Sequence, residues 1–374
     1  MVTTQPDSVE VAELNKAAAS SDISICVVNY NGEALVGDAI RAAIGAEPSF
    51  REVVLIDNGS TDRSLELVSS QFPQVRIIAL ADNRGPGAAR NAGFTSSLGD
   101  RVLFVDNDVL VTPHCAAELS RALDADREAV IAMPRVLYRH SPEIIQYDGA
   151  ESHYLGMMSL RNQDMPVHAA PSEVTQIGSL VSACFMVDRS RWGGRGGGDL
   201  FDDSFFIYHE DHDLGLRARL TGGRILAVPH AQCLHGEGTA GLSLRSTGSY
   251  RPTRVVGTIR NRWLVLLKNY QLRTLLLLSP VLVVFELFQL AGAVKKRWHR
   301  EWWRAFRHVA SHWSEIRTSR SEVQGMRRVG DGLLLRGGPV PFTTQLAGAR
   351  SERMAASVLD RICTSYWTTV KRWI

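Results

Sequence analysis

The sequence contains few cysteines, and their spacing builds no site. Only five occur in 374 residues, at Cys26, Cys115, Cys184, Cys233 and Cys363. This spacing resembles neither a zinc cluster nor a disulfide framework, and an odd number argues further against full pairing. A metal-stapled or disulfide-stapled domain is therefore excluded, and a reducing, cytosolic setting is predicted.

A secretion signal and an internal repeat are also missing. The opening MVTTQPDSVE is polar and acidic and lacks the basic start and apolar run of such signals. Residues 1–22 are predicted to form a flexible tail. Charge is nearly balanced at +3, and no nucleic-acid partner is predicted. The chain has 45% hydrophobic and 22% charged residues, which is ordinary for a protein with a packed core.

Short apolar runs alternate with helix-like segments through the first part of the chain. ISICVV, VVLID, VRIIAL and RVLFVD have the composition of buried strands. Between two of them, RSLELVSSQF places Leu65, Val68 and Phe72 on one helical face. Such alternation favours a mostly parallel sheet that is covered on both faces. We therefore predict an α/β domain over residues 23–250.

The composition changes at about residue 250. A strongly apolar stretch, interrupted by Pro280 and Glu286, is followed by the basic, tryptophan-rich KKRWHREWWRAFRH. Residues 274–294 just reach the length of a membrane span. If the first domain is cytosolic, however, one crossing would place the basic cluster outside, against the positive-inside tendency. A re-entrant or in-plane helix pair avoids this conflict. Arg260 and Asn261 open this region, and the sequence assigns them no chemical role.

The last segment, MAASVLDRICTSYWTTVKRWI, has the same character. Met354, Val358, Ile362, Tyr366 and Val370 share one helical face, and a basic end with tryptophan follows. This combination suits the headgroup zone of an anionic membrane. Residues 251–374 are therefore predicted to be a helical, membrane-associated region. The alternative is that these helices pack on the core or on a second subunit, so a homo-oligomer stays open.

Polar side chains follow three of the predicted strands. Asn29 follows the first strand, Asp57 ends VVLID, and Asp106 and Asp108 come at the end of RVLFVDND. The carboxyl ends of parallel strands line the ligand crevice of such sheets. Adjacent carboxylates repel each other unless a cation holds them, and oxygen ligands favour magnesium or manganese. Asp and Asn also favour turns, but this preference explains single residues better than the set.

The sequence resembles the family 2 glycosyltransferases. The matching segments are VVNYNG, LIDNGSTD, NRGPGAARNAG, FVDNDV, FDDSFFIYHEDHDLGLR and CLHGEG, in family order over about residues 23–240. The resemblance implies the GT-A fold, a Rossmann-like nucleotide-binding domain that is extended by an acceptor-binding half. Within the family, the pattern is most similar to bacterial rhamnosyltransferase-like members, which build cell-wall or surface polysaccharide.

The resemblance also implies a donor site and a divalent cation. By position, the nucleotide-sugar contacts would be Val28, Asn29, Asp57, Gly85, Arg90, Asp106 and Asn107. Asp57 would hydrogen-bond the base, and Arg90 would lie near the diphosphate. Asp108 and His235 would hold the cation, Mg²⁺ or Mn²⁺. His230 is the competing ligand, but the neighbouring Pro229 indicates a turn there.

A second acidic group lies in HEDHD, where Glu210, Asp211 and Asp213 begin a predicted helix. One or two acidic residues at this place would be explained by their favourable interaction with the helix dipole. That interaction does not explain three acidic residues mixed with two histidines. The family places its catalytic base at the position of Asp211, which would deprotonate the acceptor hydroxyl. Glu210 would orient the site or the acceptor, and Arg217 is positioned to pair with Asp213.

The predicted activity is inverting, metal-dependent transfer of a sugar from a nucleoside diphosphate to a glycan or polyprenyl-linked acceptor. Thymidine diphosphate rhamnose is the first donor considered, and UDP-galactofuranose, glucose and mannose donors stay open. The expected location is the cytoplasmic face of a bacterial cell membrane, peripheral or re-entrant, on an anionic membrane surface.

Three other functions fit the sequence less well than this activity. A non-catalytic nucleotide-sugar-binding scaffold would be expected to have lost Asp108 or Asp211, and both are present. A nucleotidyltransferase needs a Gly-rich, Arg-containing loop where this chain has NYNGEAL. A dehydrogenase is disfavoured because Arg90 occupies the third glycine position of the dinucleotide fingerprint.

Overall fold

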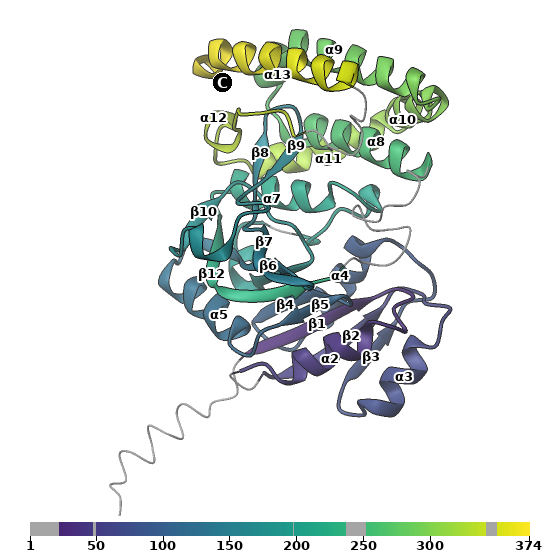
Figure 1. Ribbon diagram of the computed structural model, residues 1–374, viewed down its shortest axis with the longest axis vertical. Helices are drawn as coiled ribbons and strands as arrows, with labels where there is room; N and C mark the ends of the chain where they lie inside the picture. The colour runs from purple at the N-terminus through teal and green to yellow at the C-terminus, as the bar shows by residue number, and fades with distance from the viewer. Residues whose placement is uncertain (1–21, 48–49, 197, 237–251, 342–349) are drawn as a thin grey trace, which may run out of the picture.

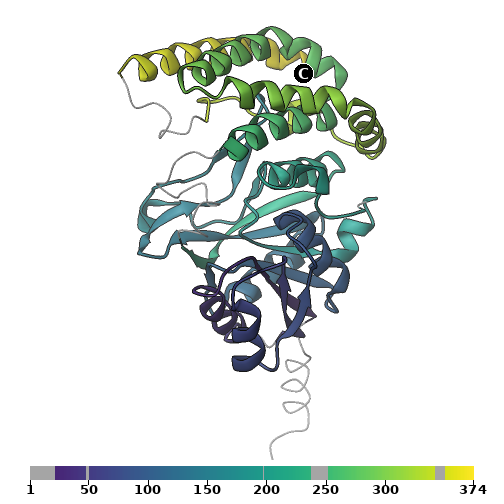
Figure 2. The same cartoon turned by 90° about the vertical axis from the view of Figure 1, so that its right-hand side faces the viewer.

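A ten-stranded mixed sheet forms the base of the molecule, and helices from the C-terminal third of the chain are stacked above it (Figure 1, Figure 2). The structure is a computed structural model that describes residues 22–47, 50–196, 198–236, 252–341 and 350–374. The predicted tail at residues 1–22 lies outside these ranges except for Asp22, and so does the glycine-rich stretch beyond Gly236.

Twelve strands occur in the described residues, ten in the large sheet and two in a hairpin. They are β1 (Ile23–Asn29), β2 (Glu52–Asp57), β3 (Arg76–Ala79), β4 (Arg101–Asp106), β5 (Val109–Val111), β6 (Ala129–Tyr138), β7 (Ser141–Tyr147), β8 (Ala150–His153), β9 (Met157–Leu160), β10 (Thr175–Ile177), β11 (Cys184–Asp188) and β12 (Arg224–His235). β8 and β9 form the separate hairpin.

The helices fall into two groups, one around the sheet and one beyond it. The first group is α2 (Val36–Ile44), α3 (Ser64–Gln71), α4 (Pro86–Ser96), α5 (Cys115–Ala125), α6 (Arg189–Gly193) and α7 (Glu210–Leu220). The second group is α8 (Pro252–Asn269), α9 (Leu272–Lys295), α10 (His299–Ser311), α11 (Trp313–Gly325), α12 (Asp331–Leu334) and α13 (Arg350–Val370).

The strand order is β10-β12-β6-β11-β4-β1-β2-β3, with β5 and β7 added at β12 and β6. β3, β2, β1 and β4 are parallel neighbours, which confirms the prediction of a mostly parallel sheet. Antiparallel β11 joins β4 to β6. All seven residues of β1 are buried, as expected for a parallel strand that is covered on both faces.

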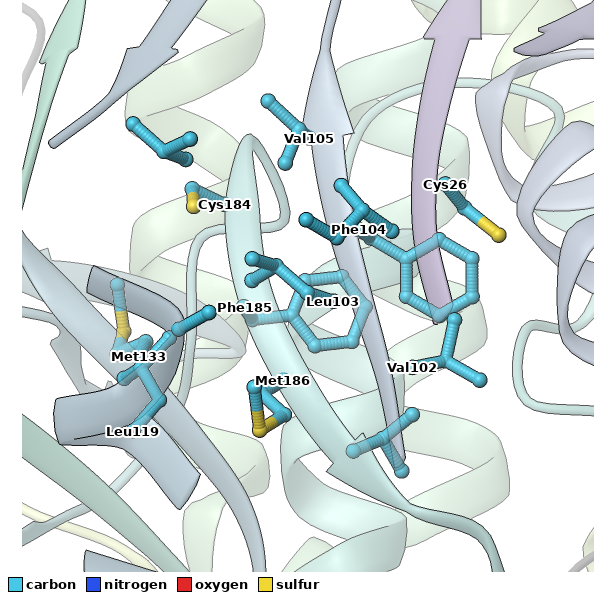
Figure 3. Close-up of a cluster of buried hydrophobic side chains, with 14 of the residues drawn as sticks. Cys26, Val102, Leu103, Phe104, Val105, Leu119, Met133, Cys184, Phe185 and Met186 are labelled. Carbon is cyan, nitrogen blue, oxygen red and sulfur yellow. The ribbon is translucent and has the colours of Figure 1, made fainter. Parts of the chain in front are cut away.

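The core lies where β4 and β11 meet, and Figure 3 shows these side chains. The rings of Phe104 and Phe185 are stacked there with centroids 5.1 Å apart. Both residues are fully buried, as are Leu103 and Met186 next to them. This packing fixes the carboxyl end of β4, where Asp106 and Asp108 follow.

β12 is one long strand with an irregularity in its pairing to β6. The register shifts between Val228 and Gln232, around Pro229, which has no N–H to give to the sheet. The sequence predicted a bent strand or a strand pair here, and the structure shows the bent strand. His230 in the shifted part is exposed, whereas His235 at the end of the strand is buried.

α9 and α13 lie side by side in the layer farthest from the sheet (Figure 1, Figure 2). The Lys295 ammonium pairs with the Glu352 carboxylate at 2.8 Å, and the Tyr366 hydroxyl donates to the carbonyl oxygen of Leu277 at 2.6 Å. These two contacts show that the helices run antiparallel. One helix of the described residues, α9, is long and apolar enough to span a membrane, which alone is weak support.

Candidate active site

A cavity of about 440 Å³ lies beyond the carboxyl ends of β1 and β4. Most of the site residues predicted from the sequence line it: Val28, Asn29, Asp106, Asn107, Asp108, Asp211 and His235. The others, Asp57, Gly85, Arg90 and Glu210, are not among the lining residues. They lie behind the lining residues, and each has contacts that explain its position.

Asn29 ties three strand ends together. Its side-chain nitrogen donates to Asp57 Oδ1 at 2.8 Å, and its side-chain oxygen accepts from Asn107 Nδ2 at 2.8 Å. The Asp57 carboxylate also accepts from the backbone N–H and the hydroxyl of Ser60, at 2.9 and 2.6 Å. These hydrogen bonds satisfy the buried carboxylate of Asp57. The bonds of Asn29 also hold the ends of β1, β2 and β4 next to one another.

Arg90 is buried behind Asp106. Its Nη2 donates to Asp106 Oδ1 at 2.5 Å, and its guanidinium carbon lies 5.5 Å from the centre of the Phe201 ring. Burial raises the pKa of Asp106, and Arg90 opposes that shift. The structure therefore places Arg90 behind the cavity wall, where it holds Asp106, and its predicted position near the diphosphate stays a prediction.

Gly85 packs against the segment that precedes α7. Its φ is +89°, and a Cβ atom at this position would lie 2.1 Å from the carbonyl oxygen of Phe206. Only glycine permits both the conformation and this approach. Its observed contact is with the protein backbone, so a direct nucleotide contact stays a prediction.

Asp108 and His235 face each other across the cavity wall. Asp108 Oδ2 lies 3.3 Å from His235 Nε2, and both side chains are 4% exposed. Pairing of β5 with β12 aligns the two residues, because Val109 pairs with His235 and the Gly236 N–H donates to the Asp108 carbonyl at 3.0 Å. The Tyr147 hydroxyl lies 3.3 Å from His235 Nδ1 and orients the ring.

This pair fits a divalent cation that takes part of its coordination from a substrate. Among the described residues, no group of three or more His, Cys, Asp or Glu side chains is placed to hold an ion. Mg²⁺ is commonly bound by one or two carboxylates together with waters and substrate phosphates. Asp108 and His235 would supply the protein ligands of such a site, with Asp106 beside them.

Glu210 and Asp211 begin α7, and Asp211 lines the cavity. Burial raises the pKa of Asp211 to about 6. Burial, together with the charge of Asp211, raises the pKa of Glu210 to about 8. Asp211 Oδ1 accepts from the His212 N–H at 2.8 Å, while Glu210 Oε2 has no partner among the described residues. A carboxyl group that titrates near neutral pH suits general-base chemistry.

The segment that leads into α7 is strained. Phe206, Tyr208 and His209 have φ values of 60, 73 and 65°, which are rare for bulky residues and common at functional sites. Asn261 of α8 holds this segment, because its Nδ2 donates to the carbonyls of Phe205, Ile207 and Tyr208 at 2.9, 2.9 and 2.6 Å. Residues 205–208 and Asn261 are called the α7 clamp below.

Arg260 reinforces the clamp from the same helix. Its Nη2 donates to the Phe205 carbonyl at 2.6 Å, and its Nε donates to Asn261 Oδ1 at 2.7 Å. Both guanidinium contacts end on the clamp, so Arg260 fixes the amide of Asn261 as well as the backbone that the amide holds. The sequence showed this Arg-Asn pair but gave no sign of its contacts.

The other end of α8 holds the first turn of α7 through Asp213. Arg217 pairs with Asp213 at 2.7 Å, as predicted, and the ammonium of Lys268 lies 3.2 Å from the same carboxylate. Asn269 donates to it at 2.8 Å. Burial opposes ionisation of Asp213, but Lys268 and Arg217 lower its pKa well below the ordinary value. The C-terminal region is therefore built into the candidate active site.

Residues 24–176 match the model of Glycosyl transferase family 2. Residues 24–176 therefore belong to this family. A relative from Mycobacterium tuberculosis, N-acetylglucosaminyl-diphospho-decaprenol L-rhamnosyltransferase, is 31% identical over 208 residues, covering 49% of this chain and 66% of the relative. Succinoglycan biosynthesis protein ExoO from Rhizobium meliloti is 37% identical over 105 residues, covering 28% of this chain and 30% of the relative.

Solved structures agree on the fold. A crystal structure of GalNAc-T7 with UDP, GalNAc and Mn²⁺ superposes with a TM-score of 0.53 and 19% identity, covering 65% of this chain and 48% of that one. The GT-A fold predicted from the sequence is thereby confirmed. The chain spans about a third to two thirds of the length of the relatives named above, so its activity is treated as a proposal.

The family match covers the acidic residues at the ends of β2 and β4 but not the acidic residues that begin α7. Asp57, Asp106 and Asp108 lie within residues 24–176, whereas Asp211 and His235 lie beyond that range. The roles predicted for Asp211 and His235 therefore rest on the geometry of the cavity.

Proposed function

We propose that this family 2 chain is an inverting glycosyltransferase that moves a sugar from a nucleoside diphosphate to a glycan or polyprenyl-linked acceptor. One observation carries the proposal: Asp106, Asp108, Asp211 and His235, from three separate stretches of sequence, line a single cavity. A scaffold without catalysis has no need for a carboxyl group held near neutral pKa beside a carboxylate–histidine pair.

Proton transfer is assigned to Asp211. A sugar hydroxyl is a poor nucleophile, and a positioned carboxylate removes its proton as it attacks the anomeric carbon. Because burial raises the pKa of Asp211 to about 6, the group is ionised at neutral pH and still basic enough to take the proton. Single displacement at the anomeric carbon inverts its configuration.

Stabilisation of the leaving diphosphate is assigned to the Asp108–His235 pair. Asp108 and His235 would hold Mg²⁺ or Mn²⁺, which when bound supplies Lewis-acid stabilisation of the charge on the diphosphate. Tyr147 keeps the His235 ring in place, and Arg90 fixes Asp106 beside the pair. These contacts preorganise the site before a donor binds.

The relatives support a choice of substrates. The name of the mycobacterial relative specifies an L-rhamnosyl donor group and a diphospho-decaprenol acceptor, so thymidine diphosphate rhamnose and a polyprenyl-linked glycan are the first pair to test. UDP-galactofuranose and glucose donors are the alternatives. The Rhizobium relative belongs to succinoglycan biosynthesis, which favours surface polysaccharide as the product class.

Docking on an anionic membrane is the second part of the proposal. Leu272, Leu276, Val283, Leu287 and Val294 form one exposed stripe along α9, each at least 57% exposed. On α13, Met354, Val358 and Ile362 are 61, 48 and 45% exposed. Exposed basic residues flank the stripes, namely Arg273, Lys295, Lys296, Lys371 and Arg372. Apolar stripes with basic flanks suit an anionic lipid surface, where a polyprenyl-linked acceptor resides.

The activity is tested by following nucleoside diphosphate release from a panel of donors, with a polyprenyl-diphosphate glycan as acceptor and Mg²⁺ or Mn²⁺ present. We expect one donor to give turnover. Asp211→Asn should bind that donor nearly as well as the wild type and lose about 10²–10⁴ in rate. Pyrophosphate release would instead indicate a nucleotidyltransferase, and donor binding without any product would indicate the scaffold. An equal loss of donor binding in Asp211→Asn would overturn the role of this residue.

A further inference from the structure

The side chain of Gln146 is a buried amide without a hydrogen-bond partner among the described residues. It lines the cavity and is only 4% exposed, yet neither Oε1 nor Nε2 has a hydrogen-bond partner in the described part of the chain. Burying a polar group without a partner destabilises a protein, and native structures contain few such groups. A ligand in the cavity that hydrogen-bonds this amide would explain why the polar group is buried.

A β-bulge directs Gln146 into the cavity. β7 pairs with β6 so that Tyr147 lies opposite Val136 while Ile145 lies opposite Leu137. Gln146 is thus the extra residue of the bulged strand. Consecutive side chains of a regular strand face opposite ways, but here Gln146 and Tyr147 both line the cavity. Bulges occur preferentially beside active sites, where they redirect a side chain.

The neighbours of Gln146 indicate which part of a ligand it meets. Tyr147 orients His235, which faces Asp108 at the site proposed for the leaving diphosphate. The cavity wall also includes the apolar side chains of Met158, Leu160 and Val181. A few polar groups placed on such a wall fix the orientation of a ligand and give specificity.

We propose that Gln146 is a specificity residue that hydrogen-bonds the hydroxyl groups of the transferred sugar. Its Nε2 donates to one sugar oxygen and its Oε1 accepts from a sugar hydroxyl, so a neighbouring hydroxyl pair satisfies both. This inference rests on the proposed glycosyltransferase function. It deepens that function by assigning the recognition of the donor sugar to a side chain outside the acidic motifs.

The test compares Gln146→Met with wild type, since methionine keeps the length of the side chain and removes its hydrogen bonding. Gln176→Met is the control, because Gln176 is exposed on β10 and does not line the cavity. Without ligand, Gln146→Met should melt at the same or a higher temperature than wild type. With the donor that supports turnover, its kcat/KM should fall at least about tenfold, because two neutral hydrogen bonds to the sugar are lost, while the acceptor KM stays unchanged.

Deoxy analogues of that donor identify the contact. Wild type should lose activity with the analogue that lacks the contacted hydroxyl, and Gln146→Met should lose little more, because residue and hydroxyl are coupled. Three outcomes would each overturn the inference. In the first, every analogue lowers the activity of both proteins by the same factor. In the others, Gln146→Met changes the acceptor KM alone or leaves kcat/KM unaffected.

Binding of thymidine diphosphate and uridine diphosphate separates this inference from the proposed function. Wild type and Gln146→Met should bind the better diphosphate equally, because Gln146 is assigned to the sugar. If wild type binds no nucleotide and no nucleotide sugar, the proposed function itself fails. If wild type transfers a sugar and Gln146→Met does so equally well, only the assignment of Gln146 fails.

Discussion

Glu210 and Asp211 are consecutive carboxyl groups whose surroundings give them different pKa values. Burial raises the pKa of Asp211 to about 6 and that of Glu210 to about 8. At neutral pH, Asp211 is then ionised and can accept a proton, while Glu210 keeps its own proton. Such separation of neighbouring titratable groups is how active sites assign acid and base roles.

A pH profile tests this assignment. If ionised Asp211 is the base, kcat should rise about tenfold per pH unit below about pH 6 and level off above it. Asp211→Asn should be slow and lack this rise. The measurement is nucleoside diphosphate release at saturating substrates. A rise centred near the ordinary aspartate value of 3.8 would contradict the buried environment seen for Asp211.

The buried carboxyl of Glu210 also predicts how stability depends on pH. Its pKa is about 8 in the folded state and 4.5 ordinarily, so the folded state retains the proton more strongly than the unfolded chain. Stability from this group is fully present below about pH 4.5 and is lost as pH rises through about 8. Above that pH, folding must bury a charged carboxylate without a partner for its Oε2.

Glu210→Gln keeps the side chain neutral and should remove this loss. We expect its melting temperature at about pH 9 to exceed that of wild type by at least roughly 2–4 °C, the change that corresponds to 1 kcal/mol in a domain of this size. Near pH 5 the two should differ much less. Glu315→Gln, on the exposed face of α11, is the matched control. The same difference at both pH values would refute the titration of Glu210.

At the scale of elements, α8 positions α7. Asn261 donates to three carbonyls of the α7 clamp, and these bonds offset the cost of three residues with positive φ. Asp211, in the first turn of α7, lies only two residues after the last of them, His209. The direction of the carboxylate proposed as the base therefore depends on a helix that the sequence placed in another region.

Asn261→Asp removes the donor while keeping the shape of the side chain. We expect kcat to fall by at least about tenfold, since a small misplacement of a catalytic group is costly, whereas the donor KM should change little because Asn261 does not line the cavity. Thr253→Ala, at an exposed position of the same helix, is the control. Equal kcat in the variant and wild type, or loss of donor affinity alone, would contradict the positioning role.

The sequence predicted the elements that carry local patterns and missed those formed by distant pairing. Parallel strands with apolar runs and Asp-x-Asp at a strand end are visible in one segment, so β1, β2 and β4 were predicted with Asp57, Asp106 and Asp108. Gln146 and Tyr147 gain their positions from a bulge against β6, which leaves no periodic signal in their own strand. Asn261 acts on backbone carbonyls more than 50 residues away, and no sequence pattern specifies such partners.

At the scale of the whole molecule, the helix layer and the cavity are connected. The β8–β9 hairpin reaches from the sheet toward the helices (Figure 1). Its Tyr154 stacks on Trp367 of α13 with centroids 4.7 Å apart and donates to the Cys363 carbonyl at 2.8 Å. β9 supplies Met158 and Leu160 to the cavity wall. One short hairpin thus joins the surface proposed to bind lipid to the wall proposed to contact the substrate.

The predicted apolar face of α13 is divided in the structure. Met354, Val358 and Ile362 of this face are exposed, whereas its last residue, Val370, is buried. The other buried residues of α13, Leu359, Cys363 and Trp367, were not part of the predicted face. Glu286, which interrupts the apolar run in the sequence, pairs with Arg262 of α8. Its charge therefore faces the protein and leaves the opposite side of α9 apolar. This arrangement favours a helix that lies on a surface with one side packed on the protein.

Placing charges on the exposed stripe of α9 tests membrane docking. Leu276→Glu with Leu287→Glu should reduce sedimentation with phosphatidylglycerol vesicles at least tenfold, because both side chains are more than 60% exposed and carboxylates oppose insertion next to anionic lipid. Leu98→Glu, at 58% exposure near the sheet, is the matched control. Added salt should weaken wild-type binding, since the basic flanks contribute by electrostatic attraction. If the double variant still binds vesicles but converts a dimer to a monomer on size exclusion, the stripe is a subunit interface and the membrane proposal is wrong.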